Sequence, residues 1–180
     1  ENYGKITYIT KVGDQEYESP AWINGDKIYY YIPSGVEVIS LGYRQTGYDT
    51  EMSGNFECDD EALNTLWQMA NRTLYVNMRD TYMDCPDRER AMWIGDMSIE
   101  MEEAMYGLDT SANDLYEKCI KTLIGWKYED VLCSVSPSIA ANLQLPIQNL
   151  LSICSMYDYY QYTGNKKFLE NVYPSVKDYM

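Results

Sequence analysis

The N-terminal part of the chain, up to about residue 50, alternates short runs of β-branched and aromatic side chains with turn-forming residues. Three runs stand out, at 6–12, 27–32 and 36–41, and glycine, asparagine, aspartate or proline bounds each of them. Such bounded runs are typical of β-strands. The pattern therefore predicts three strands, in a small β-region or in the tail of a β-domain.

Near Gly54 the spacing of apolar residues changes to that of helices. Behind an N-cap at Asp59 or Asp60, one helical stripe is formed by Leu63, Trp67, Ala70 and Leu74. Further helices are predicted over 97–106, from Thr110 to Gly125, from Pro146 to Gly164 and from about Lys166 onward. The apolar face of the helix that begins at Pro146 is predicted to consist of Leu150, Leu151, Cys154 and Tyr157.

Helix pairs that recur about every 40 to 50 residues are typical of α/α hairpin arrays. We therefore predict a mainly α fold with two parts. Residues 1–53 form a β-strand region or linker, and residues 54–180 form a series of helical hairpins.

Between the first two predicted helices, residues 84–96 show no clear amphipathic period, which indicates a loop. The segment holds two arginines, one tryptophan, and four carboxylates at Asp84, Asp87, Glu89 and Asp96. Dense charge beside a tryptophan suits a pocket for a sugar, whose ring has apolar faces and hydroxyl-bearing edges. The competing interpretation is a surface loop of ion pairs, with Asp96 as the N-cap of the next helix.

The charge balance of the chain is acidic, with 14 Lys and Arg against 28 Asp and Glu and a formal net charge of −14. Phosphate backbones and anionic membranes both select basic surfaces, so nucleic acid and membrane are not expected as partners. A neutral carbohydrate suits this balance. The 19 Tyr and 4 Trp offer flat faces for sugar rings, although a helical core also uses tyrosine.

The chain contains no His, which removes His-based triads and most His-containing zinc sites. Acid–base chemistry then falls to carboxylates, Tyr, Lys or Cys, and no metal or cofactor is expected. The five cysteines are odd in number and lack Cys-x-x-Cys spacing, which favours buried free thiols and a reducing, cytoplasmic compartment.

Cleavage of a glycosidic bond needs two carboxyl groups, one that donates a proton and one that activates water or attacks carbon. The donor has to remain protonated near the working pH, through burial or neighbouring carboxylates. Glu89 meets this need, with three aspartates close in sequence. Direct pairing with Arg88 or Arg90 would oppose it.

The three groups Asp-Cys-Pro-x-Arg, Glu-Arg and Trp-x-Gly-Asp within residues 84–96 resemble the signature of the bacterial α-L-rhamnosidases of glycoside hydrolase family 78. Segments 54–60, 145–149 and 159–165 resemble other parts of that family, and the resemblance covers roughly residues 35–180. Two departures are that the motif is one residue shorter between Arg88 and Trp93, and that Ala91-Met92 replaces Leu-Gly.

The resemblance implies a partial (α/α)6 barrel, preceded by a β-region from a β-sandwich domain, and inverting hydrolysis of terminal α-L-rhamnosides. It makes Glu89 the general acid. It also implies that Asp84 and Asp96 bind sugar hydroxyls, Arg88 contacts the sugar and Trp93 packs against its face. A rhamnose-containing oligosaccharide or glycoside is the implied partner.

In that family the general base lies far downstream, so these 180 residues are expected to be an inactive N-terminal half of the catalytic domain. The chain begins without Met, and we expect it to be a piece of a larger protein. Exposed half-barrel faces would favour homo-oligomers. The alternatives are a six-hairpin glycosidase for another sugar, a non-catalytic sugar-binding module, and a helical interaction scaffold.

Overall fold

A computed structural model describes residues 4–137 and 143–180, and it divides into two compact units, Glu1–Thr46 and Gly47–Met180. Each unit has its own organisation. The division falls near residue 53, where the sequence predicts a domain boundary. That domain assignment remains a prediction.

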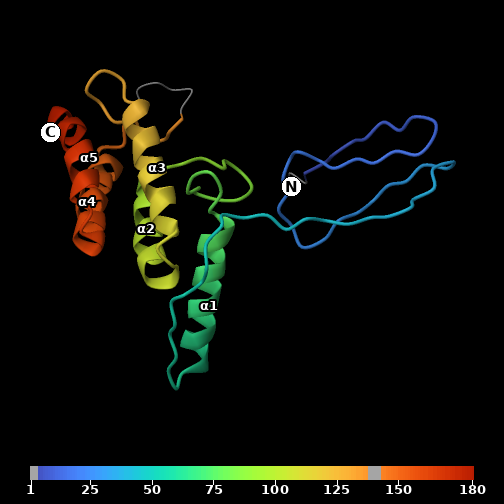
Figure 1. Ribbon diagram of the computed structural model, residues 1–180, viewed down its shortest axis with the longest axis horizontal. Coiled ribbons are helices and arrows are strands. Elements are labelled where there is room, and N and C mark those ends of the chain that lie inside the picture. The colour runs from blue at the N-terminus through green and yellow to red at the C-terminus, as the bar shows by residue number, and fades with distance from the viewer. Residues whose placement is uncertain (1–3, 138–142) are drawn as a thin grey trace. The chain divides into compact units, whose positions relative to one another are not determined.

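The first unit is extended, but its described residues form no β-strand, so the prediction of three strands over 6–12, 27–32 and 36–41 is wrong in this structure. Figure 1 draws the unit as blue tubes without arrows. Tyr8 and Tyr17 stack with ring centroids 4.5 Å apart, while Ile9, Val12 and Tyr31 are almost fully exposed. The predicted runs consist of residue types that favour β-strands, but a stable sheet also needs paired strands and a face covered by other residues.

The described residues of the second unit form five helices. Their bounds are α1 Glu61–Val76, α2 Ile94–Gly107, α3 Ala112–Gly125, α4 Pro146–Thr163 and α5 Lys166–Tyr179. The helical prediction is confirmed, and each predicted helix is present within a few residues of its expected ends. None of the helices in the described residues is long and apolar enough to cross a membrane.

Local signals in the sequence explain these helix ends. The Asp60 side chain accepts a hydrogen bond from the Ala62 N–H and caps α1. Pro146 opens α4 at its first position, and Gly164 ends it in the left-handed conformation with φ of 69°. Asn165 then caps α5 through the Phe168 N–H.

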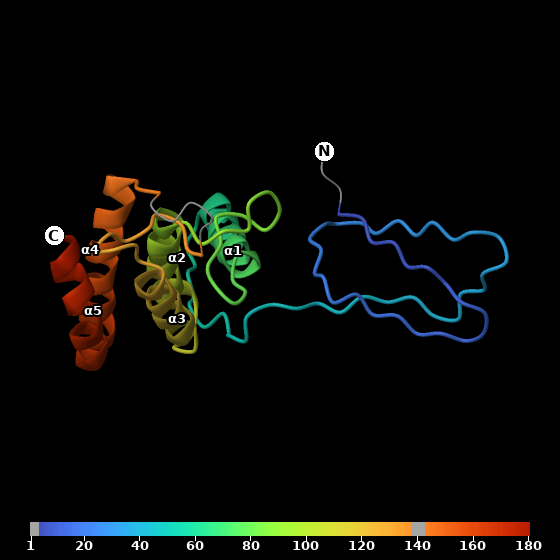
Figure 2. The same ribbon diagram turned by 90° about the horizontal axis from the view of Figure 1, so that it is seen from above.

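The core of the second unit lies around α2 and α3. These two helices lie between α1 on one side and α4 and α5 on the other (Figures 1 and 2). Buried rings join the layers, since Tyr159 lies 4.8 Å from Tyr116 and 4.7 Å from Phe168, measured between ring centroids. Both tyrosine hydroxyls are hydrogen-bonded, to Ser155 and to Glu117, so these tyrosines serve the core rather than a sugar.

The face by which α4 packs differs from the prediction. Leu150, Cys154 and Tyr157 are exposed, and the buried positions are Asn149, Ser152, Ser155, Met156 and Tyr159. Asn149 is buried because its amide is satisfied on both sides: it donates to the Leu132 carbonyl at 2.8 Å and accepts from the Ser134 hydroxyl at 2.7 Å. A polar group costs little to bury when it is hydrogen-bonded in this way.

The predicted stripe of α1 is also mostly outside the core, since only Leu74 is buried. Of the stripe, Leu63 is 47% exposed, and the neighbouring Leu66 and Met69, outside the stripe, are 59% and 61% exposed. The outer surfaces of α1 and α4 therefore both carry apolar side chains that nothing in the described residues covers.

Candidate functional site

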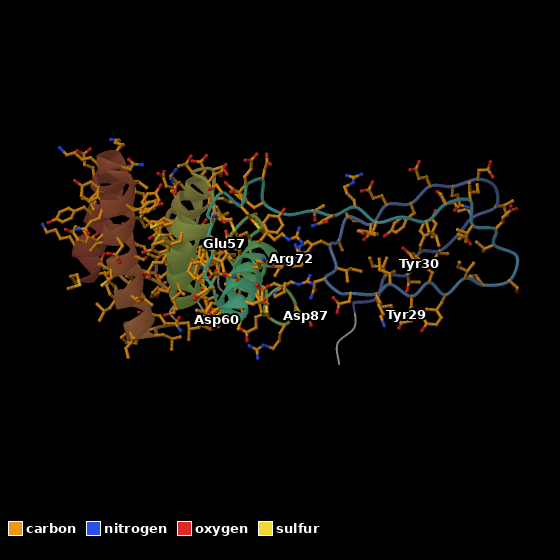
Figure 3. All side chains as sticks on the ribbon, turned by 90° about the horizontal axis from the view of Figure 1, so that it is seen from below. Tyr29, Tyr30, Glu57, Asp60, Arg72 and Asp87 are labelled. Atoms are coloured by element: carbon orange, nitrogen blue, oxygen red, sulfur yellow. The ribbon has the colours of Figure 1, made fainter. Side chains whose placement is uncertain are left out.

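The segment between α1 and α2 is a loop, as predicted, and we call residues 77–93 the motif loop. Asp84 closes it: its backbone N–H donates to the Ala91 carbonyl, and its carboxylate accepts from the Ala91 N–H, both at 3.0 Å. This double contact bends residues 84–91 into a compact turn. Asp87 is exposed on this turn and is labelled in Figure 3, together with Asp60 and Arg72 of α1.

Glu89 stands on that turn with both carboxylate oxygens engaged. The Trp93 indole N–H donates to Oε2 at 2.7 Å, and an Arg88 guanidinium nitrogen lies 2.6 Å from Oε1. The Glu89 side chain keeps 38% of its surface exposed, and that of Arg88 keeps 80%. Glu89 is thus accessible from solvent and oriented by two donors, one of them a flat aromatic ring.

Asp96 lies in the first turn of α2, beside the motif loop. Partial burial raises the pKa of its carboxyl, and the charges of Asp84 and Glu89 raise it further, although the residue as a whole is exposed. Carboxylates act on one another in this way only at short range. Asp84 and Glu89 thus both act on Asp96 through their charges.

Trp93 connects the cluster to the rest of the fold. It is half-buried and is the N-terminal cap residue of α2, where no side chain makes a capping hydrogen bond. The N-cap role considered for Asp96 is therefore wrong. Trp93 forms a β-bridge with Val135, and the Ile94 N–H donates to the Ser134 carbonyl at 3.0 Å. The backbone of Trp93 and the start of α2 are thereby fixed to Ser134 and Val135.

Of the predicted site residues, Asp84, Arg88, Glu89, Trp93 and Asp96 all lie on the motif loop or the first turn of α2. The interpretation of the segment as a loop of ion pairs is right for Arg88 and Glu89. In the described residues no group of three or more His, Cys, Asp or Glu side chains is arranged to hold a metal ion. The thiols of Cys58, Cys85, Cys119 and Cys154 are free, but only Cys119 among these four is fully buried.

The sequence did not single out Glu100, which lies one helical turn beyond Asp96 on α2. It is 8% exposed, and burial raises the pKa of its carboxyl to about 9, helped by the charges of Asp96, Glu103 and Asp84 and opposed by a hydrogen bond with the Asn77 side chain. The sequence did contain a signal that Glu100 is buried, because it lies between the apolar residues Met97 and Met101. A carboxylate flanked by core residues at helical spacing faces the interior.

The second unit consists of helical hairpins, and the loop between α1 and α2 carries carboxylates, an arginine and a tryptophan. The family description that matches residues 51–180 is the bacterial alpha-L-rhamnosidase 6 hairpin glycosidase domain. The chain belongs to this family, which confirms the resemblance seen in the motif.

Solved structures agree with this assignment. The chain resembles the GH78 family rhamnosidase of Bacillus sp. GL1 with a TM-score of 0.69 and 29% identity, over 75% of this chain and 14% of that one. It resembles the alpha-L-rhamnosidase from Dictyoglumus thermophilum with a TM-score of 0.66 and 27% identity, over 72% of this chain and 15% of that one.

Among curated relatives, an alpha-L-rhamnosidase of Formosa agariphila is 25% identical over an alignment of 150 residues, and the match covers 72% of this chain and 15% of the relative. The 180 residues therefore span a small part of the proteins they match.

Proposed function

We propose that this chain carries the acid half of the active site of an inverting glycosidase that hydrolyses terminal α-L-rhamnosides, with Glu89 as general acid. The observation that carries the proposal is the position of the Glu89 carboxylate, held by Trp93 and Arg88 beside two aspartates. The names of the relatives supply the sugar.

The neighbours of Glu89 take complementary roles in this proposal. Asp84 and Asp96 accept hydrogen bonds from sugar hydroxyls, and Asp84 uses its Oδ2 because Oδ1 already accepts from the Ala91 N–H. Trp93 offers a ring face to the sugar while its N–H orients Glu89. When sugar is bound, Arg88 contacts the sugar instead of Glu89. Glu89 then no longer pairs with a cation, and it can hold the proton that a general acid must donate.

Inversion requires a second carboxylate about 6.5–9.5 Å from the acid, on the far side of the sugar. We propose that it comes from a part of the barrel beyond these 180 residues, because the chain covers 14 to 15% of the relatives and structures it matches. No cofactor enters this scheme. The chain by itself is then expected to bind rhamnose without turnover.

The uncovered apolar surfaces of α1 and α4 fit the same proposal. Surfaces of this kind promote association when the partner helices are absent. We expect the 180-residue chain to form homo-oligomers through them, and light scattering that finds a monomer at micromolar concentration would contradict this expectation.

Two measurements on the 180-residue chain test the proposed function. NMR titration with L-rhamnose is expected to shift the Trp93 indole N–H resonance, and a matched titration with D-glucose serves as control. Incubation with an aryl α-L-rhamnoside is expected to release no rhamnose. Release of rhamnose would contradict the missing base, and equal shifts with both sugars would favour a different sugar specificity. Absence of any shift would contradict the sugar site.

A further inference from the structure

Glu100 is a buried carboxyl group that the proposed reaction does not use. It projects from the middle of α2, with 8% of its surface exposed. None of the ion pairs formed by the described residues involves it. A charged carboxylate in such a place would carry a large desolvation cost without a cation to offset it.

Three elements of the fold meet at this carboxyl. Asn77, the C-cap residue of α1, places its side-chain amide against it, and Tyr82 of the motif loop lies close enough to interact with it electrostatically. The Tyr82 N–H in turn donates to the Cys119 sulfur of α3 at 3.4 Å. Glu100 therefore sits where α1, α2, α3 and the motif loop converge.

Polar atoms in this region lack hydrogen-bond partners. Glu100 Oε2, Asn77 Oδ1 and the Tyr82 hydroxyl are all buried and unsatisfied. An ionised carboxylate only accepts hydrogen bonds and would leave Asn77 Oδ1 unsatisfied. A neutral carboxylic acid has an O–H that can donate to Asn77 Oδ1.

We infer that Glu100 is a positioning residue that remains protonated in the folded chain and uses its O–H to hold the motif loop and the end of α1 on α2. Its loss of the proton would weaken this attachment, and the loop that carries Asp84 and Glu89 would open. The inference concerns the attachment of the loop and stands whether or not the loop serves a rhamnosidase.

The groups around Glu100 support the neutral form. On α2 it faces Asp96 and Glu103, and on the motif loop it faces Asp84, so each carboxylate nearby disfavours another negative charge. On α3 it faces Cys119, whose pKa burial raises to about 12, and burial holds the pKa of Tyr82 well above its usual value. Neither of these two groups titrates before Glu100, whose own pKa is about 9.

The inference predicts a pH profile for loop opening. When the loop opens, Glu100 meets water and recovers an ordinary acidity, so opening is coupled to release of a proton. The opening constant should then rise about tenfold per pH unit from about pH 5.5 to about 8.5 and level off near pH 9.

Hydrogen–deuterium exchange of the 180-residue chain tests this profile. The probes are the hydrogen-bonded amides of Tyr82, Asp84 and Ala91, expressed as protection factors so that the intrinsic dependence on pH is removed. Glu100→Gln keeps the shape and a donor but cannot ionise, so its protection should be constant with pH. Glu102→Gln, at an exposed position of the same helix, should behave as the unmodified chain does.

A slope that persists in Glu100→Gln would overturn the inference. Because that variant could fail to fold, the unmodified chain supplies a second measurement, the ¹³C titration of the Glu100 carboxyl by NMR. A midpoint near 9 is expected, and a midpoint near the ordinary value of 4.5 would equally overturn the inference.

Discussion

Glu89 and Glu100 are the same residue type on adjoining segments, and their surroundings differ in almost every respect. Glu89 is accessible and has a cation on one oxygen and an indole N–H on the other. Glu100 is buried, faces an amide and three carboxyl groups, and has one oxygen unsatisfied. Solvent access and hydrogen-bond partners therefore decide the role of a carboxyl group. An accessible one can exchange a proton with a ligand, and a buried one can keep its proton and use it in a structural hydrogen bond.

The largest expected effect of the difference between the two glutamates is on catalysis at Glu89. In a protein that contains the complete barrel, Glu89→Gln should lower kcat for an aryl rhamnoside by about 10² or more, because the amide cannot donate the proton. Sugar affinity should be largely kept. Steady-state kinetics measure the effect, and Asp87→Asn on the same turn is the matched control, expected to retain turnover. Unchanged kcat in Glu89→Gln would remove this residue from the mechanism.

Glu100 should respond to pH rather than to substrate. Its pKa is raised in the folded chain, so the unfolded chain loses this proton first and stability falls as pH rises between about 5 and 9. The slope should approach about 1.4 kcal/mol per pH unit, and stability should be greatest at the acidic end of this range. Urea unfolding at several pH values measures it. In Glu100→Gln this part of the slope should disappear, and a variant that kept it would show that other groups are responsible.

Trp93 has two proposed roles, to orient Glu89 through its N–H and to pack its ring against the sugar, and one substitution tests them separately. Trp93→Phe keeps an aromatic face and removes the N–H that donates to Glu89. Loss of a hydrogen bond to a charged group costs about 1.5–3 kcal/mol, so kcat/KM in a complete barrel should fall roughly tenfold to a hundredfold. Rhamnose affinity should change much less. A large loss of affinity with intact kcat would assign Trp93 to sugar packing alone.

The ion pair of Arg88 with Glu89 should matter least for stability. Both side chains are more than a third exposed, and exposed pairs contribute at most about 1 kcal/mol. Arg88→Gln should therefore shift the urea midpoint only slightly, and added salt should have little further effect. A loss of several kcal/mol would mean that Arg88 organises the motif loop.

Much of the helical part could be predicted because its signals are local. Asp60 and Gly164 act on backbone groups within a few residues of themselves, so α1 and α4 have readable ends. The motif was equally readable, since Asp84, Glu89 and Asp96 lie within thirteen consecutive residues. The strands could not be predicted reliably, because the runs in the first unit depend on partners that the described residues do not supply.

The buried face of α4 shows the limit of periodicity. Leu150 and Tyr157 have the apolar character of core residues, yet they are 48% and 52% exposed. Asn149 and Ser155 are buried in their place, because Leu132, Ser134 and Tyr116 satisfy their hydrogen bonds. None of these partners lies on α4, so the pattern within the helix could not reveal the choice.

The sequence by itself determined the helices, the motif loop and the family, because capping residues, helical periodicity and a dense family motif all lie in neighbouring residues. Only the tertiary structure decided which faces are buried and how the carboxyl groups differ. Burial and hydrogen-bond partners come from segments distant along the chain, and they set the free energy of each charge. That is why Glu89, conspicuous in the motif, is exposed and paired, whereas Glu100 is buried and neutral.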